Sequence, residues 1–165
     1  MAELTELEEK VAEVWGLAQA SQKAADKVAK LFEEEEDGEQ YTTLLERMKA
    51  EAKQTDERCE QVASSREGKK TAISDKARET KQEAEEMMQT YLGGEDVEAL
   101  DGLEFLIMSE AGELGHVEIV REFATAQGDQ EIVGLVEEVL PIQERHFADI
   151  RKAALAKAQS EARES

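Results

Sequence analysis

The sequence has little cysteine, proline or aromatic residue, and each shortage excludes a class of protein. Its one cysteine, Cys59, excludes an internal disulfide and fits a reducing compartment. One proline and 4% aromatic residues, in a chain rich in Ala, Glu, Lys, Leu and Gln, are typical of long helices rather than sheets. No stretch reaches the roughly 18 apolar residues of a membrane span, and the first residues lack a signal pattern. We therefore expect a soluble, cytoplasmic protein.

Basic residues are also scarce, because 20 Lys and Arg stand against 40 Asp and Glu, for a net charge of −20. Nucleic acids and anionic membranes bind clustered Lys and Arg, so the composition excludes both as partners. A chain of 165 residues is long enough to bury one substantial core. We expect a single domain over residues 1–165.

Apolar residues recur at alternating steps of three and four in five stretches, as one face of an α-helix requires. The stretches cover residues 4–32, 41–62, 73–91, 96–124 and 132–153. Between them lie the acidic run Glu33–Asp37 with Gly38, the segment Ser64–Gly68, the pair Gly93–Gly94, and Gly128. The pattern predicts an all-α, up-down bundle of about five antiparallel helices joined by short turns.

The ends of the last two helices carry capping signals. Asp96 is the predicted N-cap of the fourth helix. Gly128 is the predicted left-handed residue that closes it, and Asp129 is the predicted N-cap of the fifth. The polar residues 159–165 are expected to form a frayed tail.

Two residue pairs near the C-terminus have the spacing of metal ligands. Glu113 and His116, and likewise Gln143 and His146, are three residues apart, so on a helix both members point the same way. Glu and His at this spacing on facing helices hold two iron or manganese ions in ferritin-like bundles. The second pair has Gln143 where that pattern needs a carboxylate, and a neutral amide is a poorer ligand for a hard cation.

Each pair also has a purely structural interpretation. Gln143 and His146 lie on the inward stripe of the fifth helix, where an unpartnered polar group costs about 1–3 kcal/mol. They form either a metal or proton-transfer site or a buried hydrogen-bonded pair that fixes the register between helices. Glu113 and His116 face either the interior, together with Glu110, or the solvent.

Four short segments of the last two-thirds of the chain are distinctive: Glu57–Val62, Glu67–Lys70, His116–Ile119 and the turn through Gly128. With them, the region from about Glu51 to Ile150 resembles the ferritin-like stress-protein family typified by YciF. The resemblance implies a ferritin-like bundle with a carboxylate di-metal centre, dimer formation and a link to stress or desiccation responses.

The resemblance also implies ligand positions at which this chain has lost the ligand: Gln22, Ala50, Lys53, Gly115 and Gln143. Glu51 is a substitute one residue away from the second of them. We therefore interpret the protein as a non-catalytic bundle with a degenerate metal centre and no cofactor. It would act as a stress-associated structural or partner-binding protein and form a homodimer.

Two alternatives remain open at this point. The first is a di-iron or di-manganese carboxylate protein, for peroxide or oxygen chemistry or metal storage, with a rearranged ligand set: Glu113, His116, Glu138 and His146. The second is an acidic helical scaffold that recruits another protein through an adaptable stripe on the third helix: Met87, Met88 and Tyr91.

Overall fold

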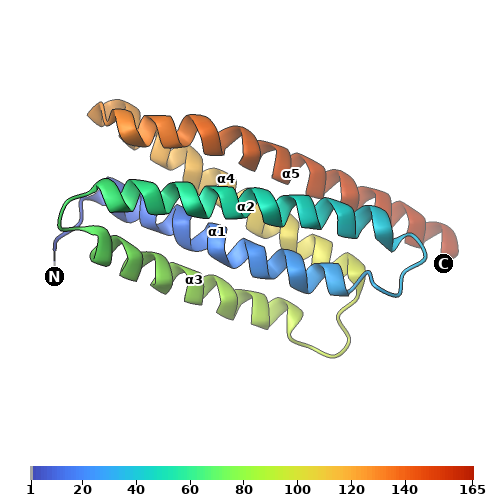
Figure 1. The fold of residues 1–165 in the computed structure, drawn as a ribbon. Helices are drawn as coiled ribbons and strands as arrows, with labels where there is room; N and C mark the ends of the chain where they lie inside the picture. The colour runs from blue at the N-terminus through green and yellow to red at the C-terminus, as the bar shows by residue number, and fades with distance from the viewer. Residues whose placement is uncertain (1) are drawn as a thin grey trace.

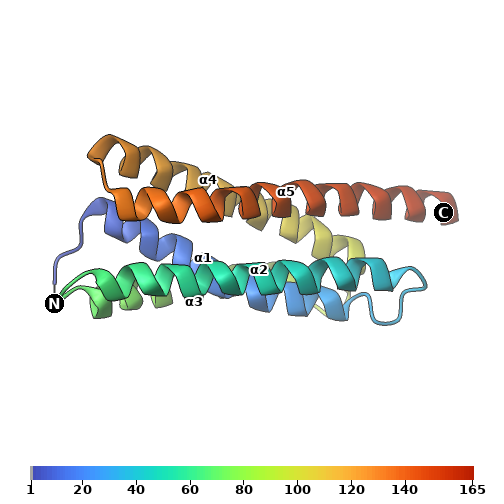
Figure 2. The same ribbon diagram turned by 45° about the horizontal axis from the view of Figure 1, so that its top comes forward.

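The computed structural model describes residues 2–165 and contains five α-helices. The helices are α1 (Glu6–Lys30), α2 (Gly38–Ser65), α3 (Lys70–Leu92), α4 (Ala99–Gln127) and α5 (Gln130–Glu164). They lie along one long axis, and their connections alternate between the two ends of the bundle (Figure 1, Figure 2). No strand occurs within residues 2–165, so the predicted all-α class and number of helices are confirmed.

Local capping explains where the helices begin and end. The Thr5 hydroxyl accepts a hydrogen bond from the Glu8 amide at 3.2 Å, and the Glu8 carboxylate accepts one from the Thr5 amide at 2.9 Å. This capping box starts α1. Gly128 closes α4 at a φ of 69°, and Asp129 starts α5 by accepting from the Ile132 amide at 3.2 Å. Both predictions for this turn are confirmed.

Two predicted boundaries differ from the structure. The N-cap of α4 is Glu98 rather than Asp96. The reason is Asp101, which lies three residues inside the helix and accepts the Glu98 amide at 2.8 Å. At the other end of the chain, α5 continues to Glu164, so the residues predicted as a frayed tail are helical up to that point. Ala, Glu, Lys and Arg, which have high helix propensity, dominate this segment.

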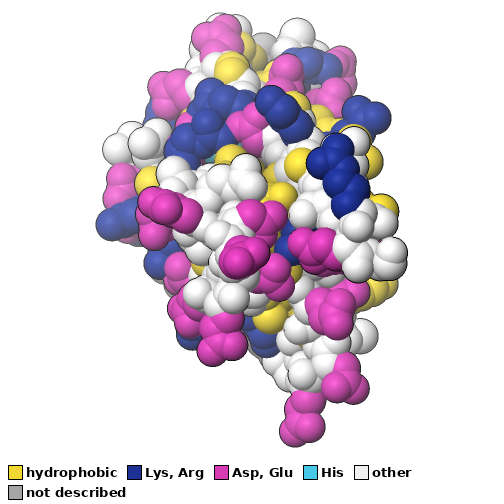
Figure 3. All heavy atoms as spheres, turned by 90° about the vertical axis from the view of Figure 1, so that its right-hand side faces the viewer, with side chains coloured by type: hydrophobic (Ala, Val, Ile, Leu, Met, Phe, Trp, Pro, Cys, Tyr) yellow, Lys and Arg dark blue, Asp and Glu magenta, His cyan; other side chains and the backbone are white. Residues whose placement is uncertain are grey.

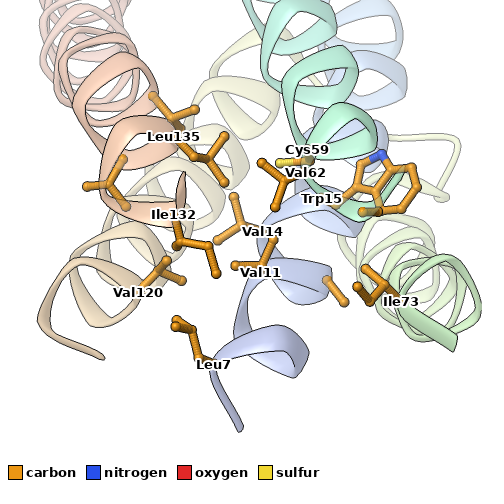
Figure 4. Packing of buried hydrophobic residues seen from close by; sticks show 14 of the residues in the cluster. Leu7, Val11, Val14, Trp15, Cys59, Val62, Ile73, Val120, Ile132 and Leu135 are labelled. Carbon is orange, nitrogen blue, oxygen red and sulfur yellow. The ribbon is translucent and has the colours of Figure 1, made fainter. Parts of the chain in front are cut away.

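The apolar core consists of two clusters, one at each end of the bundle. The first lies at the end where α1 begins, and Figure 4 shows side chains from all five helices meeting there. Its members include Leu7, Val11, Val14, Trp15, Cys59, Val62, Ile73, Val120, Ile132 and Leu135. Cys59 is a fully buried core residue, as predicted. Burial raises the pKa of its thiol to about 12, so it stays protonated and unreactive near neutral pH.

The second cluster lies at the opposite end and includes Val28, Phe32, Leu45, Leu103 and Ile150. A gap with polar side chains separates the two clusters along the bundle axis. Buried polar residues of α4 and α5, namely Glu110, Glu113, Gln143 and His146, lie in this region.

Helix α1 runs through the middle of the bundle and approaches α3 closely at one point. At Gly16 the backbone of Ala77 leaves no room for a side chain. Beyond Thr80, however, α3 has no buried residue until Leu92 at its last position. The C-terminal half of α3 therefore covers the rest of the bundle incompletely.

Candidate functional site

A layer of buried polar side chains crosses the bundle between the two apolar clusters. It contains Glu51 of α2, Glu110 and Glu113 of α4, and Gln143 and His146 of α5, and we call it the central polar layer. Glu110 and His146 are each 2% exposed, Glu113 is 7% exposed and Gln143 is 8% exposed. The α4 and α5 members lie on the inward faces that the apolar periodicity predicts.

Gln143 is the centre of this layer. Its side-chain nitrogen donates hydrogen bonds to Glu110 Oε2 at 2.6 Å and to Glu113 Oε2 at 3.2 Å. An amide nitrogen carries two hydrogens, so both can be used on the two carboxyl groups. Since the acceptors belong to α4 and the donor to α5, these bonds fix the register of the two helices.

His146 connects the same layer to α2. Its Nε2 lies 3.2 Å from Glu51 Oε1, and its Nδ1 lies 3.7 Å from Glu110 Oε2. The two ring nitrogens point to opposite sides of the imidazole, so the ring separates these carboxylates. Glu51 also forms an ion pair with Arg145 through its Oε2 atom. Its Oε1 atom, which faces His146, lies 3.6 Å from Arg47 Nε. Glu51 therefore links the buried layer to a charge cluster at the surface.

The electrostatics of Glu113 follow from its burial. Burial raises its pKa well above the ordinary value of 4.5, and the neighbouring Glu110 raises it further through its charge and a side-chain hydrogen bond. Hydrogen bonds from Gln143 and Ser21 act in the opposite direction and are the smaller effects. Glu113 thus keeps a proton at pH values at which exposed glutamates are ionised.

The structure divides the predicted ligand set Glu113, His116, Glu138 and His146. Glu113 and His146 belong to the central polar layer. His116 is 39% exposed and faces Glu13 on α1 at 3.4 Å, and the Glu138 carboxylate is 58% exposed and accepts from Arg58 at 2.8 Å. The four side chains of this set therefore do not converge on one point.

The ligand register that the resemblance implies does not match the helix faces. Ala50 and Lys53 are exposed, and Gly115 has open space where its side chain would be. Gln22 is only partly buried and donates to Asp56 Oδ2 at 3.1 Å. Of the implied positions only Gln143 is in the layer. The reason is helix rotation, because a shift of one residue turns a helical side chain by about 100°.

Two members of the layer were not predicted as ligands from the sequence. Glu110 was recognised as an inward residue, and its distance of three residues from Glu113 is the signal that places both on one face. Glu51 was considered only as a substitute for its neighbour. The sequence signal for Glu51 is its position between Met48 and Ala52 on the inward stripe of α2.

The carboxyl groups of the central polar layer contact Gln143 and His146 rather than converge on one point. The Gln143 nitrogen, a donor, points at the two carboxyl groups that would be ligands. The His146 ring lies between Glu51 and Glu110, so these two carboxylates are on opposite sides of the imidazole. A cavity of about 10 Å³ beside Glu113 and Gln143 is about the size of one water molecule. Within residues 2–165, no group of three or more His, Cys, Asp and Glu side chains is arranged to hold a metal ion.

A second feature lies on the surface, where α3 diverges from α4. A groove of about 560 Å³ has α1 as its floor, and we call it the α3–α4 groove. Its apolar lining consists of Leu17, Ala20, Ala24, Ala84, Met87, Met88, Phe105 and Met108. Met87 is 52% exposed and Met108 is 41% exposed, although both are large apolar side chains. Glu113 of α4 lines both this groove and the internal cavity.

No protein-family model, curated protein or solved structure matches the chain. In the described part of the chain, none of the helices has the apolar length that a membrane crossing needs. Function is therefore inferred from the central polar layer and the α3–α4 groove.

Proposed function

We propose that this protein is a non-catalytic, ferritin-like helical bundle that acts by binding another protein. The proposal is carried by the position of Gln143, whose amide nitrogen lies 2.6 Å and 3.2 Å from the carboxyl groups of Glu110 and Glu113. The residues that would supply chemistry are thus hydrogen-bonded to one another across α4 and α5. The α3–α4 groove, by contrast, exposes large apolar side chains, among them Met87 and Met108.

The ferritin-like part of the proposal is supported by the placement of the polar residues. Acidic and histidine side chains from α2, α4 and α5 face one another midway along the bundle, where ferritin-like proteins hold their metal ions. In the proposed arrangement the helices alternate in direction and hydrogen bonds take the place of metal coordination. The step from this architecture to function is an analogy, so the binding role rests on the groove.

The partner-binding part is supported by the unequal burial of α3 and α4. Exposed methionines are adaptable contact residues, because their side chains are flexible and polarisable. Apolar patches of this kind mark interaction sites more often than they occur without a role. The stress association and the homodimer remain predictions from the resemblance, and a homodimer is proposed to form outside the groove.

One observation favours a second function, metal binding. Three carboxyl groups and one imidazole, from Glu51, Glu110, Glu113 and His146, belong to one buried layer. An iron or manganese protein would use this set rather than His116 and Glu138. It would also require the Gln143 amide to turn its oxygen inward and Glu51 to leave its arginine partners.

Elemental analysis of untagged protein separates the two functions. The protein is purified from cells grown with added iron and manganese and dialysed without chelator, and metal content per chain is measured by mass spectrometry. The non-catalytic proposal predicts far less than one ion per chain, because the Gln143 amide nitrogen, a donor, already occupies the carboxyl oxygens of Glu110 and Glu113. One or two tightly held iron or manganese ions per chain would contradict it.

A further inference from the structure

We propose that the α3–α4 groove binds an amphipathic helix of another protein, with an apolar stripe along it and Lys or Arg residues at one end. This inference rests on the proposed function and adds the chemical identity of the partner. Its basis is the shape of the groove, the charge at each of its ends, and the charge of the whole chain.

The groove has the dimensions of a helix-binding site. Small residues of α1, among them Ala20, Ser21 and Ala24, form the floor, whereas large side chains of α3 and α4 form the walls. On α4 the lining extends from Phe105 to His116, roughly 17 Å at the rise of an α-helix. Three turns of a partner helix span that length. Amphipathic helices bind such grooves through apolar residues spaced three and four apart.

The end of the groove nearest the α3–α4 connection is acidic. There Phe105 and Met108 also line a second hollow, of about 410 Å³, which we call the acidic hollow. Its charged lining residues are Glu95, Asp96, Asp101 and Glu104. Among residues 2–165, no Lys or Arg lines it. Figure 3 shows mostly acidic side chains in the lower part of this end of the molecule, where the connection lies.

The opposite end of the groove is electrically balanced. Lys10 Nζ lies 3.3 Å from Glu13, and His116 faces the same carboxylate at 3.4 Å. Lys76 also lines this end and lies 3.8 Å from Glu79. The groove is therefore largely apolar with Glu83 on its α3 wall, and its acidic side chains are most concentrated at the end beside the acidic hollow. A matching helix carries its positive charges at one end.

The charge of the chain selects against other occupants. A second copy, with its net charge of −20, does not complement the acidic end of the groove. A partner helix with Lys or Arg is attracted instead, both at long range and at the acidic hollow. Tyr91 and Phe105, whose ring centroids are 6.0 Å apart, stand beside that hollow. Tyr91 is 55% exposed and provides an aromatic face for a cationic group of the partner.

The test uses a fluorescein-labelled helical peptide of about 16 residues, long enough for three turns of contact. It has Leu at alternating steps of three and four and Lys in its last turn. Two control peptides have the same Leu positions with Glu in place of Lys, and the same composition in an order that destroys the apolar stripe. Binding is measured by fluorescence anisotropy at low and at physiological salt.

Two pairs of protein variants localise the binding site. Met87→Glu combined with Met108→Glu alters the groove, and Ile119→Glu combined with Leu155→Glu makes the same change at exposed apolar residues elsewhere. For charge, Glu95→Gln, Asp96→Asn and Glu104→Gln together remove three of the four charges of the acidic hollow and keep Asp101, which caps α4. The matched control is Glu33→Gln, Glu34→Gln and Glu36→Gln in the exposed α1–α2 connection.

The Lys peptide is expected to bind the natural protein, and the methionine variant to weaken that binding by about tenfold or more. Removing these charges from the acidic hollow is expected to weaken it by roughly threefold to tenfold at low salt and to reduce its salt dependence. Both control variants are expected to bind like the natural protein. The inference is overturned if the scrambled peptide binds equally well, or if the control variants lose as much affinity.

Two further outcomes separate this inference from the proposed function. If the Glu peptide binds as tightly as the Lys peptide, the basic partner is wrong while groove binding stands. If sedimentation shows a dimer that the methionine variant dissociates, the occupant is a second copy and the inference is again overturned. Metal content, by contrast, decides the non-catalytic proposal and does not depend on any peptide result.

Discussion

The central polar layer and the α3–α4 groove depart from the usual distribution of side chains in opposite ways. The layer has five polar residues inside the bundle, from Glu51 to His146, and nearly all their charged or polar groups meet a partner. The groove has large apolar residues at the surface, and Met87 and Met108 have solvent on one side. The polar groups of the first region are paired within the chain, whereas apolar side chains of the second remain exposed to solvent.

Helix α4 contributes residues to both regions. The inward face of α4 presents Glu110 and Glu113 to α5, and its next face presents Met108 and Gly112 to the groove. Glu113 belongs to both regions. Substitutions in α4 can therefore separate residues that stabilise the fold from residues that are available for binding.

Placing a fourth carboxylate in the layer is expected to have the largest effect. Gln143→Glu removes the donor between Glu110 and Glu113 and puts like charges in a poorly solvated space. We expect a loss of about 3–5 kcal/mol in the free energy of unfolding at neutral pH with chelator present, as for an uncompensated buried charge. Urea denaturation measures it, and Gln54→Glu on the exposed face of α2 is the control. Unchanged stability would mean that Gln143 does not hold the layer together.

The next largest effect is expected where α4 meets the second apolar cluster. Leu106 is 1% exposed and lies two residues before Met108, which is 41% exposed. Leu106→Ala is expected to cost about 2–5 kcal/mol, because it removes buried methyl groups and leaves a cavity. Met108→Ala is expected to cost much less. Equal losses would show that the groove wall is packed as tightly as the core, and would remove the distinction between the two regions.

The raised pKa of Glu113 predicts how stability depends on pH. The folded state holds this proton more tightly than the unfolded state, whose pKa is near 4.5. The contribution is therefore fully present below pH 4.5 and is lost as pH rises toward the folded pKa, by at most about 1.4 kcal/mol per pH unit. Glu113→Gln mimics the protonated form and does not titrate. We expect the variant to gain stability over the natural protein as pH rises.

Glu104→Gln, at an exposed position of the same helix, is the control for this profile. It is expected to follow the natural protein at every pH. Parallel profiles for the natural protein and Glu113→Gln would contradict the proton held in the layer. In that case Glu113 would be ionised in the folded protein, and its carboxylate would be stabilised by hydrogen bonds from Gln143 and Ser21.

Most of the architecture could be predicted from the sequence because it depends on local pattern. The steps of three and four define the five stripes, and they also place Glu110, Gln143 and His146 inside. The ligand positions that the resemblance implies do not match the inward helix faces, because short similar segments do not fix the rotation of a helix. On α2 the implied positions are Ala50 and Lys53, whereas the residue in the layer is Glu51. Met87 and Met88 of the stripe predicted on the third helix do line the groove, but the groove itself could not be predicted from sequence patterns. It depends on the divergence of α3 beyond its contact with Gly16, which is a property of helix packing.

The smallest effect is expected for the groove itself, and it is the most informative about function. Met87→Gln combined with Met108→Gln replaces apolar side chains that are about half exposed. We expect the free energy of unfolding to change by no more than about 0.5 kcal/mol, as for surface substitutions away from packed features. Binding of the Lys peptide should fall sharply in the same variant, because its apolar stripe loses the groove walls. A large loss of stability would show that these methionines pack against the fold, and that the groove is part of the core.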